Sequence, residues 1–264
     1  MKRNDSDRQP IYSVLAPLYD HIMRDVDYEA WADYIDDLIQ LHTPYSEQLL
    51  ELACGTGSVS LSLGELGYYR ILATDQSRQM IQVARKKSEE ADSPVRFRPM
   101  NFLNIQLKQT FDVVFMVFDS LNYLHTEQEI LQLHNEVKNV LRPGGFFIFD
   151  YTTPCHSREA IRYLDGEKGV VDNRFRYRQS SQFDESSRIH TNRFRIELLE
   201  NGGKNGQQVL FEEHQQKAWS YPTMNSILDK TDFHILNRYD GFELVPAHEQ
   251  SHRITIVSQC LKTA

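Results

Sequence analysis

The chain has 264 residues, of which 40% are hydrophobic and 25% are charged, so it can bury a sizeable core without disulfide or metal cross-links. Its formal net charge of −8 argues against nonspecific binding of a nucleic-acid phosphate backbone. The cysteines, Cys54, Cys155 and Cys260, are spaced too widely for a disulfide framework or a CxxC-type zinc site. This cysteine usage is typical of a reducing compartment.

The sequence shows no pattern typical of a targeting signal or a membrane span. The start, MKRNDSDRQP, has no apolar stretch behind it and so does not resemble a secretory signal. No apolar run approaches the roughly 18 residues that a membrane-spanning helix needs. We therefore expect a cytoplasmic protein that has no membrane partner.

The first regular element in the chain is an amphipathic helix. Residues 28–41 place Tyr28, Trp31, Ile35 and Leu38 at helical spacing, with acidic residues between them. Such a helix packs its apolar side against a larger body. We expect residues 1–46 to form an N-terminal helical lid segment.

Between residues 47 and 150 the pattern alternates between strands and helices. The apolar runs predict strands at 48–53, 71–73, 95–98, 111–118 and 146–150. The helix before the fifth strand begins with a capping box, Thr126 to Glu129, and ends before an Arg-Pro-Gly-Gly stop. Alternation of this kind predicts a parallel sheet that helices cover on both faces.

After residue 151 the polar and apolar residues alternate with period two, around 174–178 and 193–198. Turn-forming residues at 184–187 and 201–206 separate these runs, which predicts an antiparallel meander over 172–219. A short helix at 224–229 and strands at 234–239 and 253–260 complete the chain.

The predicted fold is therefore α/β: a Rossmann-like, seven-stranded, mostly parallel sheet with helices on both faces and an antiparallel β insertion after strand five. We expect residues 47–151 and 220–264 to form the core domain, and 152–219 to form an inserted antiparallel β lid.

A glycine-rich turn at the end of the first strand points to a ligand site. Gly55 and Gly57 allow the backbone to turn sharply and to approach a ligand closely. Asp75 follows Gly57 by 18 residues, at the end of the second strand, where it can accept hydrogen bonds from both hydroxyls of a ribose. Asp75 could instead be an ordinary helix N-cap.

Three ribose-containing ligands are compatible with this turn: NAD, ATP and S-adenosylmethionine. The NAD fingerprint needs a third glycine where the chain has Ser60, and the Walker loop is absent. An acidic residue at the end of the first strand, Glu51, suits a cationic amino-acid end better than a pyrophosphate. The sequence therefore favours S-adenosylmethionine.

Five segments, in this order and spacing, resemble the class I S-adenosylmethionine-dependent methyltransferases. They are LLELACGTGSVS, ILATDQS, MNF at 100–102, FDVVFMVFDSLNYL and VLRPGGFFIFD. The opening IYSVLAPLYD and the insertion resemble the small-molecule branch that contains glycine and sarcosine N-methyltransferases. The resemblance covers residues 46–150 well and the last two strands more loosely.

The resemblance also implies roles for individual residues in holding S-adenosylmethionine. Ala53, Gly55 and Gly57 would line its methionine moiety, with Glu51 orienting the loop. The other implied contacts are Asp75 at the ribose, Gln76 and Met80 flanking the adenine, Phe102 against the adenine edge, Asn101 accepting from the adenine amino group where the family usually has Asp, and the carbonyl of Phe118 at the ammonium.

The chemistry requires a nucleophile to displace the sulfonium methyl group, and a base only if the acceptor is protonated. We expect Asp119, Tyr19 and Tyr123 near the reacting centre, with Tyr12, His21 and His125 as further candidates for the base. Asp119 could equally hydrogen-bond a loop amide. The sequence predicts no metal site, because the histidines show no metal-ligand spacing.

The predicted function is therefore methyl transfer from S-adenosylmethionine to a nitrogen or oxygen atom of a small molecule. Two alternatives stay open: a methyltransferase acting on RNA or protein, and a non-catalytic module that binds S-adenosylmethionine. The chain has FDSL at 118–121 instead of an NPPY-type tetrapeptide, which argues against methylation of base amino groups. We expect a monomer or a homodimer.

The arginines at 174, 176, 178, 193 and 195 allow two interpretations. They could line a solvated sheet face with acidic neighbours, which is the interpretation that we favour. They could instead point into the active site and select an anionic substrate.

Overall fold

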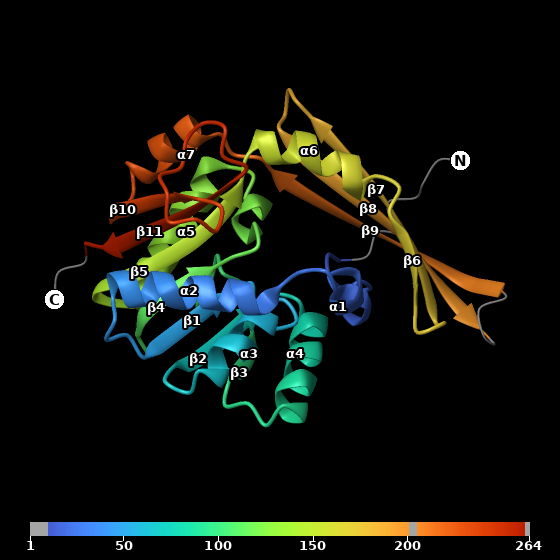
Figure 1. Cartoon of the computed structure of the whole chain (residues 1–264), viewed down its shortest axis with the longest axis horizontal. Helices are drawn as coiled ribbons and strands as arrows, with labels where there is room; N and C mark the ends of the chain where they lie inside the picture. The colour runs from blue at the N-terminus through green and yellow to red at the C-terminus, as the bar shows by residue number, and fades with distance from the viewer. Residues whose placement is uncertain (1–9, 201–204, 262–264) are drawn as a thin grey trace.

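The computed structural model describes residues 10–200 and 205–261. Most of the turn predicted at 201–206, and the beginning of the predicted N-terminal segment, lie outside these residues. Within them the chain forms a seven-stranded sheet with flanking helices and a separate four-stranded sheet (Figure 1).

The central sheet has the strand order β10-β11-β5-β4-β1-β2-β3. Neighbouring strands among β1 to β5 pair in parallel, and β11 runs antiparallel to both β5 and β10. Its strands are β1 (Gln48–Leu52), β2 (Arg70–Asp75), β3 (Arg96–Pro99), β4 (Phe111–Met116), β5 (Leu141–Thr152), β10 (Phe233–Asp240) and β11 (Arg253–Cys260). The predicted Rossmann-like fold with a mostly parallel sheet is confirmed.

Helices cover both faces of this sheet, as the alternation of strands and helices predicts. Consecutive strand residues such as Leu49 and Leu50 point to opposite faces and belong to two different buried clusters. One face packs against α2 (Tyr28–His42), α3 (Ser58–Glu65) and α4 (Arg78–Glu90), and the other against α5 (Glu127–Val140) and α7 (Tyr221–Leu228). The predicted capping box is present at the start of α5.

The insertion after β5 begins with a helix that the period-two pattern did not predict, α6 (Pro154–Leu164). An antiparallel sheet follows, made of β6 (Lys168–Val171), β7 (Phe175–Asp184), β8 (Ile189–Glu200) and β9 (Asn205–Lys217). This sheet extends away from the core to one side (Figure 1). The predicted antiparallel insertion is confirmed, although the sheet starts at Lys168 and not at 172.

The N-terminal segment bridges the core and the inserted sheet. It contains η2 (Ala16–Leu18) and α1 (Tyr19–Ile22), which lie between α4 and the inserted sheet (Figure 1). Leu15 and Leu18 form a small buried cluster with Val171, Tyr177 and Ile196 of the inserted sheet. The segment therefore joins the two sheets over the carboxyl ends of the parallel strands.

The fourth strand ends earlier than predicted. The apolar run predicts a strand as far as Phe118, but β4 ends at Met116, and Phe118 and Asp119 adopt left-handed φ angles of 61° and 49°. Two consecutive left-handed residues cannot continue a strand. They turn the chain into η3 (Ser120–Tyr123) and place both side chains at the edge of the sheet where ligands bind in this architecture.

Candidate functional site

The turn between β1 and α3 contains two glycines, and glycine is needed at each for a different reason. Gly57 has a φ of 79°, and an added Cβ would lie 2.4 Å from the Phe97 ring, so this position needs glycine for packing. Gly55 has a φ of 55°, and an added Cβ would meet no atom within 4 Å. Gly55 lines a cavity, whereas Gly57 does not.

Asp75, at the end of β2, holds this turn in place. Its carboxylate accepts hydrogen bonds from the backbone N–H of Gly55 at 2.9 Å and of Ser77 at 2.7 Å. Burial raises the pKa of Asp75, and these two hydrogen bonds oppose that rise. The N-cap of α4 is Ser77, so the alternative in which Asp75 caps the helix is wrong.

A cavity of about 250 Å³ lies over the turn, and most of the residues assigned to cofactor binding line it. Among its lining residues, all within the described part of the chain, three are acidic (Glu51, Asp75 and Glu129), and none is Lys, Arg or His. A cavity with this lining attracts a cation and disfavours a pyrophosphate. We call it the acidic cavity.

Glu51 is the most deeply buried of these acids. Its side chain accepts a hydrogen bond from the Ser60 hydroxyl, and only 2% of the residue is exposed. Burial raises the pKa of Glu51 to about 8, which the Ser60 hydrogen bond partly offsets. A cationic group beside Glu51 would stabilise the ionised carboxylate.

Four tyrosines also line the acidic cavity: Tyr12, Tyr19, Tyr28 and Tyr123. Burial raises the pKa values of all four, so these phenols stay protonated near neutral pH. The Oη atom of Tyr28 is buried and has no hydrogen-bond partner among the described residues. An unpaired buried hydroxyl is costly, and a bound ligand can supply its partner.

A second cavity, of about 400 Å³, lies beside the first and shares Phe118 with it. Its wall includes Asp119, His156 of α6, His190 of β8 and Arg253 of β11. Burial lowers the pKa of His156 to about 4 and also lowers that of His190, so both imidazoles are neutral at pH 7. We call this the mixed cavity.

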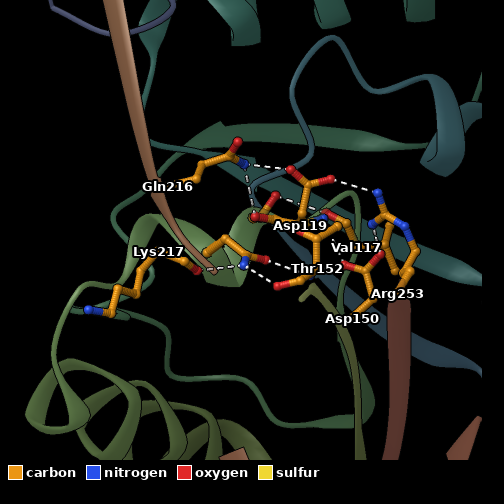
Figure 2. Close-up of polar contacts among 9 residues, drawn as sticks. Val117, Asp119, Asp150, Thr152, Gln216, Lys217 and Arg253 are labelled. Atoms are coloured by element: carbon orange, nitrogen blue, oxygen red, sulfur yellow. Dashed lines mark hydrogen bonds and ion pairs between the residues drawn. The ribbon is translucent and has the colours of Figure 1, made fainter. Parts of the chain in front are cut away.

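Asp119, which lines the mixed cavity, is held in a network of hydrogen bonds and ion pairs (Figure 2). Its carboxylate pairs with Arg253 at 2.8 Å and accepts a hydrogen bond from Gln216 at 2.5 Å. Arg253 also pairs with the buried Asp150, whose carboxylate accepts from the backbone N–H of Asp119 at 2.8 Å. Burial raises the pKa of Asp150 to about 6, and Arg253 opposes that rise.

The residues predicted for the site thus divide between two cavities. Tyr19 and Tyr123 line the acidic cavity, whereas Asp119 lines the mixed cavity and has its carboxylate oxygens occupied by partners. The predicted cofactor residues that line the acidic cavity are Glu51, Ala53, Gly55, Asp75, Gln76, Met80, Asn101, Phe102 and Phe118. The Asn101 amide oxygen already accepts from the backbone N–H of Leu103 at 2.8 Å.

Three polar residues near the cavities carried no signal in the sequence analysis: Glu212, His214 and Arg253. His214 contacts Tyr123 and Glu212 deep in the inserted sheet. The two side chains of a Glu-x-His sequence lie on the same face of a strand, because side chains alternate between faces. The local sequence does not indicate what that face packs against. Only the tertiary fold brings them to the cavities.

The arginines of the insertion do not line either cavity. Arg176 and Arg195 pair with Glu197 on the exposed face of the sheet, and Arg193 pairs with Glu213. This arrangement supports the interpretation of a solvated sheet face.

Two kinds of feature are absent from the described residues. They contain no group of three or more His, Cys, Asp or Glu side chains placed to hold a metal ion. None of their helices is long and apolar enough to span a bilayer.

Comparison with known proteins identifies the domain that carries the acidic cavity. Residues 49–145 match a family model described as a methyltransferase domain. Over these residues the chain is similar to methyltransferases, as the class I S-adenosylmethionine-dependent resemblance of the five segments predicts. The matched residues contain the glycine turn, Asp75 and the loop of Phe118, which are three parts of the cavity wall.

Similarity to individual methyltransferases extends beyond that domain. YqeM of Bacillus subtilis, named as a methyltransferase, is 27% identical over 96% of this chain and 98% of its own length. A glycine/sarcosine N-methyltransferase of Parasynechococcus marenigrum is 28% identical over 54% of this chain and 48% of its own. The structure of a methyltransferase from Clostridium acetobutylicum superposes with a TM-score of 0.75 at 24% identity, over 95% of this chain and 99% of that one. The similarity predicted from the five segments is confirmed.

Proposed function

We propose that this protein transfers the methyl group of S-adenosylmethionine to an amine nitrogen of a small molecule. The observation that carries this proposal is that two cavities with different linings meet at Phe118. One of them is acidic and tyrosine-rich, and the other has mixed polarity.

The lining of the acidic cavity fits S-adenosylmethionine. The cofactor has a positively charged sulfonium and ammonium against one carboxylate, so its net charge suits a wall with acids and no basic side chain. Gly55 leaves room that a Cβ would fill, and the unpaired Tyr28 hydroxyl offers a hydrogen bond. NAD, with its anionic pyrophosphate, would meet Glu51 and Asp75 without a compensating cation.

Each residue would then have a definite part in holding the cofactor. Asp75 would hold the ribose, since each oxygen that accepts one backbone N–H has a further lone pair. Glu51 would balance positive charge. Gln76, Met80, Asn101 and Phe102 would surround the adenine. Tyr19 is held over the site because the neighbouring Asp20 accepts from Thr56 at 2.5 Å and pairs with Lys87 at 2.9 Å.

The bound cofactor supplies an electrophilic methyl group, and the protein contributes positioning and the exclusion of water. The N-terminal segment and the inserted sheet close over the carboxyl ends of the strands. Phe118, where the cavities meet, stacks on Trp31 of the mixed cavity with ring centroids 4.3 Å apart, so the junction has an apolar side. Asp119 is placed to fix this loop through Arg253 and Gln216, and to contact the acceptor from the second cavity.

The mixed cavity suits a polar acceptor of modest size. The neutral imidazoles of His156 and His190 and the amide of Gln216 can hydrogen-bond hydroxyl or amine groups, while Trp31 and Phe242 offer apolar faces. Relatives that match about half of this chain are named as a dTDP-amino-sugar N,N-dimethyltransferase and a cypemycin N-terminal methyltransferase. These names support nitrogen as the acceptor atom.

The test is a transfer assay with S-adenosylmethionine labelled on its methyl group. The probes are matched pairs of small molecules that differ only in an amine or a hydroxyl, such as glucosamine and glucose, together with α-amino acids and short peptides. We expect label on the amines, and we expect His156→Ala to raise KM for the amine while leaving S-adenosylmethionine affinity unchanged. Label found only on the hydroxyl partners, or only on added RNA or protein, would contradict the proposal.

A further inference from the structure

A chain of four polar side chains connects the acidic cavity with the interior of the inserted sheet. The hydroxyls of Tyr12 and Tyr123, both on the cavity wall, lie 2.7 Å apart. Tyr123 is in turn 2.8 Å from Nδ1 of His214, and Nε2 of His214 is 2.8 Å from Glu212. His214 and Glu212 are 3% and 1% exposed, so water does not compete for these contacts.

Glu212 fixes the direction of every hydrogen bond in this chain. Its carboxylate accepts from the backbone N–H groups of Tyr12 at 2.5 Å, Val14 at 2.9 Å and Leu15 at 3.2 Å. An acceptor held in this way requires Nε2 of His214 to carry the hydrogen that it shares with Glu212. Nδ1 of His214 is then left with a free lone pair.

The remaining directions follow from that lone pair. Tyr123 must donate its hydroxyl hydrogen to Nδ1 of His214, so its oxygen accepts the hydroxyl hydrogen of Tyr12. Tyr12 has then used its only hydrogen and presents a lone pair to the cavity. The cavity wall at Tyr12 is therefore an acceptor for an N–H group.

We propose that His214, oriented by Glu212, takes up the proton that an amine acceptor loses when it is methylated, and that Tyr12 and Tyr123 relay this proton. The inference rests on the proposed function. As the C–N bond forms, the C–S bond breaks and its electron pair returns to sulfur, which leaves a proton in excess on nitrogen. That proton passes to Tyr12, the hydrogen of Tyr12 to Tyr123, and the hydrogen of Tyr123 to Nδ1 of His214.

The charges around the chain are compatible with this direction of transfer. Burial, and the carboxylates of Asp119 and Asp75, raise the pKa of Tyr12, and burial also raises that of Tyr123. Both hydroxyls therefore act as neutral relays and not as phenolates. Glu212, on the same strand as His214, stabilises the imidazolium that forms. The proton returns along the chain once the product leaves.

The alternative is a purely structural role, because Glu212 also ties the N-terminal segment to β9. Two ligands separate the roles without any methyl acceptor. S-adenosylhomocysteine is a thioether that lacks the methyl group, and sinefungin places an amine where the methyl group would be. A structural lock would affect both ligands alike, whereas the relay affects only the amine.

The experiment measures the dissociation constants of both ligands at one fixed pH, together with kcat for an amine that the wild type methylates. We expect the preference for sinefungin over S-adenosylhomocysteine to fall about tenfold or more in Tyr123→Phe and His214→Leu. In these variants Tyr12 is no longer held as an acceptor for the charged amine of sinefungin. His214→Asn keeps an acceptor for Tyr123, so it should keep the wild-type preference, but it cannot take up a proton and should lower kcat for the amine.

The exposed His234 of β10 supplies the control, and His234→Leu should match the wild type in preference and in kcat. An unchanged preference in Tyr123→Phe, or a wild-type kcat in His214→Asn, would overturn the relay. So would an equal loss of affinity for both ligands. If the wild type binds neither ligand, the proposed function itself fails, and the inference fails with it.

Discussion

The acidic cavity and the mixed cavity meet at Phe118, yet they are built from the chain in opposite ways. Apart from the tyrosine-rich N-terminal segment, the acidic cavity takes its wall from residues 51–129, where ligand groups follow strand ends at fixed spacing. The mixed cavity combines the N-terminal segment, α2, α6, β8, β9 and β11, which are far apart in sequence. The residues of the cofactor side are therefore positioned by local sequence patterns, whereas those of the acceptor side are brought together only by the tertiary fold.

We expect the largest effect on stability from replacing Arg253, the cation of the mixed cavity. Arg253→Met leaves the fully buried Asp150 without its cation and removes one partner of Asp119. We expect the free energy of unfolding to fall by about 3–5 kcal/mol, as measured by urea denaturation. Lys230→Met removes an exposed pair with Glu127 and should cost less than about 1 kcal/mol. Equal effects of the two substitutions would contradict the importance of the buried network.

The two glycines of the acidic cavity give a matched pair. Gly57→Ala forces a Cβ into the Phe97 ring and should lower the free energy of unfolding by about 2–4 kcal/mol. Gly55→Ala meets open space, so it should cost only the strain of a left-handed φ, about 1 kcal/mol, but it should weaken S-adenosylmethionine binding. Thermal unfolding and ligand titration of both variants test this. If Gly55→Ala left binding unchanged, Gly55 would not approach the cofactor.

Glu51→Gln should separate stability from binding. In the free protein the pKa of Glu51 is raised to about 8, so the folded state holds a proton that the unfolded state releases above about pH 4.3. The charged residue therefore costs stability increasingly as the pH rises from about 4 to 8. We expect Glu51→Gln to be more stable than the wild type by about 1–2 kcal/mol at pH 8 and equal to it near pH 4.

The same variant should bind S-adenosylmethionine about tenfold more weakly at pH 8, because it lacks the negative charge. Urea denaturation at both pH values and calorimetric titration measure the two effects. A variant that is less stable at pH 8, or that binds with wild-type affinity, would rule out an electrostatic role for Glu51.

The smallest effect is expected on the outer face of the inserted sheet. Arg176→Gln removes an exposed pair with Glu197, so the free energy of unfolding should change by less than about 0.5 kcal/mol. KM for an amine acceptor should not change, since Arg176 lines neither cavity. A rise in KM would revive the hypothesis that these arginines select an anionic substrate.

Much of the core could be predicted from sequence because its signals are local. The glycine turn, the strand-end Asp75 and the capping box at Thr126 depend on neighbouring residues alone. The end of β4 was missed because Phe118 is apolar and continues the run, although its φ is left-handed. Helix α6 was missed because its first residue, Pro154, and its short length gave no clear period.

The polar groups behind the cavities could not be predicted for a different reason. Arg253 meets Asp119 and Asp150 only after β11 inserts beside β5. His214 reaches Tyr123 only when β9 lies across η3. Each pair joins residues roughly 90 or more positions apart, and no local spacing encodes such a contact.

The most direct test of the account is a calorimetric titration of the wild type and Asp75→Ala with S-adenosylmethionine, S-adenosylhomocysteine and NAD. The exposed Asp229→Ala serves as the control for the loss of a carboxylate. We expect the wild type and the control to bind both sulfur ligands but not NAD, and Asp75→Ala to bind them at least tenfold more weakly. Binding of NAD alone would contradict the assignment of the acidic cavity to a cationic cofactor.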